Sequence, residues 1–62
     1  MRLIEVFKKG KITLRVLYDR EWDEYSVKWY DDGEHDEDKT YYTNDKKDAL
    51  GTAKLSLERI ER

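Results

Sequence analysis

The sequence contains no cysteine and no proline, and only three of its 62 residues are glycine. Without cysteine the chain can form neither a disulfide framework nor a thiolate metal site, so the staples common in small domains are absent. It also lacks any long apolar run, which excludes a transmembrane helix and the apolar core of a secretory signal. We therefore expect a single cytoplasmic domain over residues 1–62, near the lower size limit for independent folding and without membrane contact.

Charged residues are abundant and are sorted by position. The chain has 13 basic and 15 acidic side chains, for a net charge of −2. Residues 1–18 carry five bases and one acid, residues 19–38 carry ten acids and two bases, and the remainder contributes +2. An acidic middle is thus flanked by basic ends, a layout that matters more for partners than the total does.

Alternating apolar and polar residues predict β-strands. Ile12, Leu14, Val16 and Tyr18 alternate with more polar neighbours over residues 11–19, and residues 25–30 repeat the pattern. Both segments are typical of half-buried strands, and pairing Tyr18 with Tyr25 keeps their apolar sets on one face. Residues 39–42 form a shorter fourth candidate after a turn-like acidic segment.

The first hairpin is predicted to join residues 2–7 to the strand over residues 11–19. Lys8, Lys9 and Gly10 suit a three-residue loop with Gly10 in the left-handed conformation. In this register Val6 faces Ile12 and Ile4 faces Leu14.

The spacing of apolar residues changes after Asp45. Leu50, Ala53, Leu57 and Ile60 recur at intervals of three and four, which predicts a helix over about residues 46–60. Asp45 is the expected N-cap, and Asp48 stands where a capping box has its second acid. Gly51 either allows close packing on the sheet or lies on the solvent side.

These elements define an α+β fold: a three- or four-stranded antiparallel β-meander with one C-terminal α-helix packed on one face. The expected core is this set: Ile4, Val6, Ile12, Leu14, Val16, Val27, Trp29, Leu50, Ala53, Leu57 and Ile60. One helix covers one side of the sheet only. Leu3, Phe7, Leu17 and Tyr30, with one of Tyr41 and Tyr42, are therefore expected on an uncovered face, where contiguous apolar groups tend to mark interfaces.

Residues with catalytic chemistry are scarce. The sequence has one histidine, His35, in the acidic stretch, and two serines, Ser26 and Ser56. A Ser-His-Asp arrangement needs a base held between a nucleophile and an acid, and general acid-base catalysis needs a buried carboxyl group. We predict a protein that is not an enzyme.

The acidic stretch over residues 31–38 is dense in oxygen ligands but lacks the spacing of an EF-hand, because its glycine is third rather than sixth. No glycine-rich phosphate loop is present, and we expect no metal and no cofactor. The acidic residues are instead candidates for a protein interface, together with the open face: Asp31, Asp32, Glu34, Asp36, Glu37 and Asp38.

Binding of single-stranded nucleic acid is an alternative. Lys8, Lys9 and Lys11 gather at one hairpin tip, with Arg15 and Lys28 beside aromatic residues on the open face. A pI of about 5.3 opposes this reading. Conversely, the acidic stretch can imitate a phosphate backbone and occupy a nucleic-acid-binding partner.

Two segments of the chain are residues 25–27 and Tyr42-Thr43-Asn44-Asp45-Lys46-Lys47-Asp48-Ala49-Leu50-Gly51-Thr52-Ala53-Lys54. Together they resemble the HicB-like antitoxin pattern, in which a capping Thr or Asp precedes an acid-Ala-Leu group on a sheet-packing helix. Small strand-then-helix proteins encoded by phages share such a helix start. The resemblance implies a partial RNase-H-like module that neutralises a partner by docking.

The sequence therefore favours a small interaction module, such as an inhibitor or antitoxin-like regulator. It is expected to bind a protein partner or a second copy of itself through the open face and the acidic segments.

Overall fold

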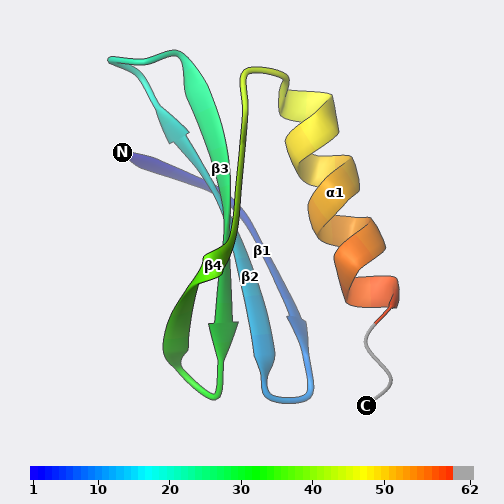
Figure 1. Cartoon of the computed structure of the whole chain (residues 1–62). Helices are drawn as coiled ribbons and strands as arrows, with labels where there is room; N and C mark the ends of the chain where they lie inside the picture. The colour runs from blue at the N-terminus through cyan, green and yellow to red at the C-terminus, as the bar shows by residue number, and fades with distance from the viewer. Residues whose placement is uncertain (60–62) are drawn as a thin grey trace.

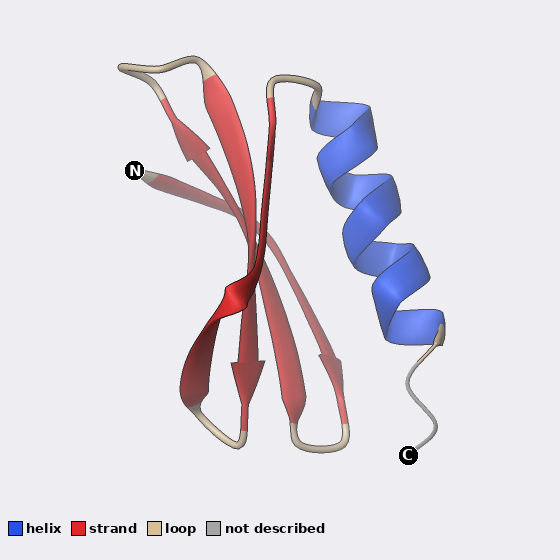
Figure 2. Cartoon of the chain, viewed as in Figure 1, coloured by secondary structure: helices blue, strands red, loops and turns tan. Residues whose placement is uncertain are grey.

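The computed structural model describes residues 1–59 as a four-stranded antiparallel sheet with one helix lying across it (Figures 1 and 2). The elements are β1 (Arg2–Lys9), β2 (Ile12–Asp19), β3 (Glu24–Asp31), β4 (Glu34–Thr43) and α1 (Lys46–Glu58). The strands lie in chain order, β1-β2-β3-β4, and α1 contacts all four on one face. The predicted α+β meander with one C-terminal helix is confirmed, with four strands.

The fourth strand is much longer than predicted. It begins at Glu34, directly after a two-residue turn in which Asp32 and Gly33 both have positive φ angles, 53° and 87°. This is the geometry of a type I′ hairpin turn, which favours Asp-Gly. The stretch over residues 31–38 is thus the end of β3, a tight turn and the first half of β4 rather than a loop.

The register of β1 differs from the prediction. Gly10 has the expected positive φ, 59°, but the turn contains two residues, so Lys9 pairs with Ile12 and Phe7 pairs with Leu14. Because side chains alternate between the faces, this slip turns Phe7 toward the helix and Val6 toward the open face. A bulge at Ile4 returns Leu3 to the open face, as predicted, and there Leu3 pairs with Leu17.

The core lies between the sheet and α1. Its buried hydrophobic residues are Ile12, Leu14, Val16, Val27, Ala49 and Ala53. Partly buried side chains pack around them: Ile4, Phe7, Tyr25, Trp29, Leu50 and Leu57. The prediction that Val6 belongs to the core is wrong, and Phe7 takes that role. Ile60 lies outside the described residues.

The helix begins as predicted at Asp45, whose side chain accepts a hydrogen bond from the backbone N–H of Lys47 at 2.9 Å. The capping box is not formed. Thr43 accepts from the Asp45 N–H, and Asp48 accepts instead from the Tyr41 hydroxyl. Gly51 is exposed, and a Cβ built there meets nothing within 4 Å, so it lies on the solvent side.

Across residues 1–59, the helix is neither long enough nor apolar enough to cross a bilayer.

Candidate functional site

The face of the sheet opposite α1 is the candidate site, and we call it the open face. The strand register arranges its side chains in three rows across the sheet. The first row is Leu3, Leu17, Ser26 and Tyr42; the second is Val6, Arg15 and Lys28; the third is Lys8, Thr13, Tyr30 and His35. None of these eleven positions carries an acidic side chain, but the next pair along β2 and β3, Asp19 and Glu24, lies on the same face beyond Leu17 and Ser26 and is acidic.

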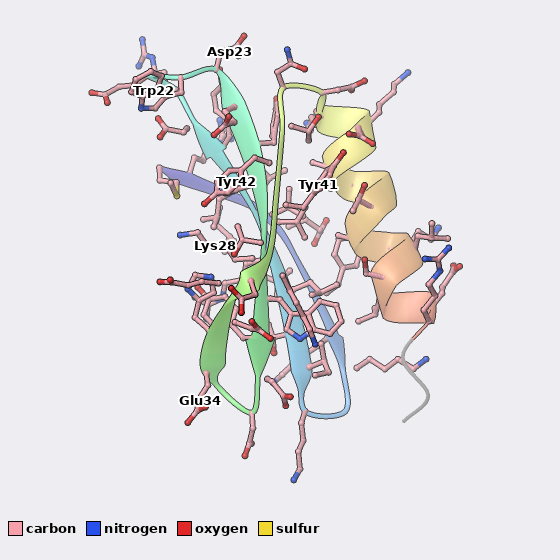
Figure 3. All side chains as sticks on the ribbon, in the orientation of Figure 1. Trp22, Asp23, Lys28, Glu34, Tyr41 and Tyr42 are labelled. Carbon is pink, nitrogen blue, oxygen red and sulfur yellow. The ribbon has the colours of Figure 1, made fainter. Side chains whose placement is uncertain are left out.

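The apolar side chains are concentrated at one end of the open face. Leu3 is 52 % exposed and Tyr42 is 59 % exposed, with the half-buried Leu17 between them in the row. Figure 3 shows Tyr42 on the side away from the helix, whereas Tyr41 lies on the helix side. Trp22, 75 % exposed, lies on the β2–β3 loop beyond this end (Figure 3). These large side chains form an exposed apolar region next to the cationic row.

The second row places cations at the centre of the face. Arg15 and Lys28 are directly paired across β2 and β3, with Val6 beside Arg15 on β1. Within residues 1–59, neither cation forms an ion pair, since the one found there joins Lys39 to Asp36 at 3.8 Å. Two adjacent, unneutralised cations attract carboxylates or phosphates from a partner.

The third row is aromatic. The Tyr30 and His35 rings stack with centroids 5.0 Å apart, and the Arg15 guanidinium carbon lies 4.8 Å from the Tyr30 ring centroid. The His35 ring nitrogen Nε2 also lies 3.2 Å from the Thr40 hydroxyl, which belongs to the irregular part of β4. There, one residue of β3, Lys28, faces four residues of β4, 37–40. This irregularity brings Thr40 next to His35.

The structure places three of the four residues predicted for the open face on that face. Leu3, Leu17 and Tyr30 lie on the open face as predicted, and Phe7 does not, because of the shorter β1–β2 turn. Val6 takes its place. Trp22 was not among the residues predicted for the interface, although a tryptophan within a charged loop is a sequence signal for an exposed binding residue.

The predicted lysine cluster at the β1–β2 hairpin is divided. Lys8 lies on the open face opposite Thr13, whereas the Lys9 ammonium group donates to the Leu57 carbonyl oxygen at 3.4 Å. Lys9 therefore serves the C-terminal end of α1, where carbonyl groups lack helical partners. Lys11 lies in the turn itself. Lys8, Arg15 and Lys28 are the cations of the nucleic-acid candidate set that share one surface.

The acidic residues are spread along the β3–β4 hairpin, at the end of the sheet that also holds the β1–β2 turn (Figure 1). Asp31 and Glu34 pair across the turn, and Asp36 pairs with Trp29 on the helix side. Glu37 and Asp38 lie in the irregular part of β4. No group of three metal-ligating side chains occurs among residues 1–59.

Two tyrosine hydroxyls outside the open face donate to carboxylates. Tyr18 donates to Asp23 at 2.7 Å, and this hydrogen bond raises the tyrosine pKa above its ordinary value. Tyr41 donates to Asp48 at 2.6 Å, which raises the Tyr41 pKa and lowers that of Asp48. The first bond holds the β2–β3 loop and the second joins β4 to α1, so both serve the fold.

No family model, no curated protein and no solved structure matches the chain. The likeness to HicB-like antitoxins therefore stays a prediction from residues 25–54. Fold and site define the class that can be stated: a small α+β domain with a four-stranded sheet whose uncovered face is both apolar and cationic.

Proposed function

We propose that this protein is a non-enzymatic interaction module that binds a partner protein on the open face. The partner surface that fits combines apolar side chains with carboxylates. One observation carries the proposal. Four of the seven exposed large hydrophobic residues among residues 1–59 lie on the open face or on the adjoining loop: Leu3, Val6, Tyr42 and Trp22.

The open face has the amino-acid composition of a hot spot in a protein–protein interface. Arginine, tyrosine and tryptophan dominate protein–protein hot spots because they bury much area and retain specific polar contacts. Arg15, Tyr30, Tyr42 and Trp22 supply these side chains here. Since Arg15 and Lys28 lose water on docking, a partner carboxylate opposite them is needed to compensate that cost.

A second copy of this chain fits the open face poorly. A symmetric face-to-face dimer places the same patch on both sides of the interface. In a dimer centred on the second row, the two copies of Arg15 and Lys28 would face one another, because the carboxylates on this face, Asp19 and Glu24, lie at its end. We therefore propose a partner of different sequence, which is also the mode of action implied by the resemblance to antitoxins.

Site-specific photo-crosslinking in the source cell tests this proposal. A benzoylphenylalanine at position 42 samples the open face, and the same group at position 55 samples the outer side of α1, where Leu55 is 50 % exposed. We expect a discrete foreign adduct at position 42 that is absent at position 55. Adducts common to both positions, or adducts of this chain with itself alone, contradict the proposal.

Charge reversal then tests the mode of binding with the purified partner. We expect Arg15→Glu and Lys28→Glu each to weaken binding at least tenfold, about 1.4 kcal/mol. Lys54→Glu, which makes the same charge change on the exposed side of α1, is the matched control and should leave affinity nearly unchanged. Equal effects of all three variants would indicate a general charge effect and contradict docking on the open face.

Single-stranded nucleic acid is a second candidate for the same surface, favoured by the contact of Arg15 with Tyr30 and the stacking of Tyr30 on His35. This candidate predicts binding of a labelled oligonucleotide that weakens steeply between 50 and 200 mM salt, as about three phosphate contacts require. Arg15→Glu should abolish it and Lys54→Glu should not. Anisotropy that stays flat at low salt contradicts this candidate and leaves protein binding unaffected. Imitation of a phosphate backbone by residues 31–38 stays a prediction from the sequence.

A further inference from the structure

A groove on the helix-covered side of the sheet meets the end of the open face at Leu3. It lies where β1 and β3 begin, β2 ends and α1 starts, and comprises two adjoining cavities of about 430 and 300 Å³. Arg2 and Tyr18 line both cavities. Leu3, Ile4, Tyr25 and Lys46 complete the larger one, and Met1 and Arg20 the smaller one. We call this the end groove.

The end groove has a basic rim. Arg2 and Lys46 flank the larger cavity, and Arg20 adds a third cation at the smaller one. None of these forms an ion pair within the described chain, and no carboxylate lines either cavity. In a protein of net charge −2, this rim gathers three cations, although the β2–β3 hairpin at the same end also carries Asp19, Glu21, Asp23 and Glu24, of which Asp23 binds the Tyr18 hydroxyl.

The wall of the end groove is aromatic and apolar. The Tyr18 and Tyr25 rings pack with centroids 4.8 Å apart and planes tilted by 40°, and Ile4 lies beside them. Both tyrosines are only partly buried, so ring surface stays accessible. The Tyr18 hydroxyl is already engaged by Asp23, which fixes the orientation of this ring. A flat apolar ring can therefore stack on a wall that is held in place before binding.

We propose that the end groove binds a small molecule that joins a phosphate group to a flat ring, the chemistry of a nucleoside monophosphate. Arg2 supplies the planar fork that pairs with phosphate oxygens, and Lys46 supplies a second charge for the dianion. Tyr18 and Tyr25 stack on the base. The cavities are of the size that small ligands occupy in proteins. This inference does not depend on the proposed function of the open face.

Backbone amide NMR of the whole chain can test the proposal during titration with adenosine monophosphate, adenosine or inorganic phosphate. We expect the monophosphate to shift the amide signals of residues 2–4, 18, 25 and 46 and to saturate. Adenosine and phosphate alone should each bind at least tenfold more weakly. Equal affinity for inorganic phosphate would show that the ring is not recognised and would overturn the proposal, as would shifts confined to other residues or no shifts at all.

Charge-reversal variants locate the phosphate. Arg2→Glu and Lys46→Glu should each weaken binding of the monophosphate at least tenfold. Lys47→Glu makes the same change in the same turn of α1 but does not line the cavities, so it should alter affinity by less than about twofold. A Lys47→Glu effect as large as that of Lys46→Glu would overturn the assignment. The amide spectrum of each variant reports directly whether it remains folded.

Discussion

At the scale of single residues, glycine serves two opposite roles in this chain. Gly33 has a φ of +87° in the β3–β4 turn, a conformation that side chains rarely adopt. Gly51 lies in the middle of α1 on its solvent side, with open space where a Cβ would be. The first glycine is required by the backbone, whereas the second weakens the helix without any packing role.

Replacing Gly51 with alanine should therefore stabilise the protein by about 0.5–1 kcal/mol, because alanine reduces the backbone entropy lost on folding. Urea denaturation followed by circular dichroism measures the change. Gly33→Ala is the matched control and should destabilise the fold. A lower midpoint for Gly51→Ala would contradict the solvent-side placement.

The hydrogen bond from Tyr41 to Asp48 makes the stability of the protein depend on pH. The pKa of Asp48 is lowered from its ordinary value of 3.8, with the bond to Tyr41 as the largest cause. Its stabilising contribution is thus present above pH 3.8 and is lost as the pH falls through the lower folded-state value. The pKa of Tyr41 is raised from 10.0, so its contribution is present below pH 10 and is lost above the folded-state value.

Tyr41→Phe should accordingly lower the thermal midpoint between about pH 5 and 9, and the difference from the wild type should shrink toward either extreme. Scanning calorimetry across this range measures it. Tyr42→Phe is the control, because Tyr42 lies on the open face away from Asp48. A pH-independent difference would contradict the assigned bond.

At the scale of elements, hairpin turns decide which side chains reach the open face. The alternation of residues 12–18 and 25–30 was enough to predict β2, β3 and the pairing of Tyr18 with Tyr25. It was not enough for β1, because a turn of two residues or three is compatible with Lys8-Lys9-Gly10-Lys11 and the choice reverses Val6 and Phe7. Turn geometry and the bulge at Ile4 depend on packing that period-2 patterns do not encode.

The start of β4 was predictable in principle. Asp32-Gly33 is a strong hairpin signal, yet the charge of the residues that follow resembles a solvated loop more than a strand. They can form a strand because β4 is an edge strand, and charged side chains there also discourage pairing with other chains. The candidate site followed the same division: Leu17 and Tyr30 on β2 and β3 were placed correctly, whereas on β1 only Leu3 was, and Trp22 on the β2–β3 loop was missed.

Alanine substitutions on β1 test the register. Phe7→Ala should destabilise the protein by about 2–3 kcal/mol, because Phe7 packs against the core. Val6→Ala should cost less than about 1 kcal/mol, since Val6 is 41 % exposed on the open face. Chemical denaturation measures both values. The three-residue turn predicts the reverse order, so a larger effect at Val6 would contradict the observed register.

At the scale of the whole molecule, one side of the sheet forms the core and the other forms the candidate binding surface. The helix-covered side holds the six buried hydrophobic residues. Their combined side-chain volume is small because two of them are alanines. The open face retains large side chains that add nothing to this core. In a chain of 62 residues, large apolar side chains outside the core reduce the stability that the fold can reach. Their presence on the open face is the reason for expecting a ligand there.

The small core also limits how much stability can be lost. Stability of about 0.05–0.15 kcal/mol per residue gives roughly 3–9 kcal/mol for a chain of this length. Leu14 is fully buried at the centre of the sheet, and a buried leucine replaced by alanine typically costs about 2–5 kcal/mol. Leu14→Ala should therefore leave a large unfolded fraction at 25 °C, visible as loss of the far-ultraviolet circular dichroism signal.

Leu55→Ala removes the same atoms from a half-exposed position and should remain folded, because little area is withdrawn from water there. If both variants unfold, stability rests on more than the helix-covered core; if neither does, Leu14 is not at its centre.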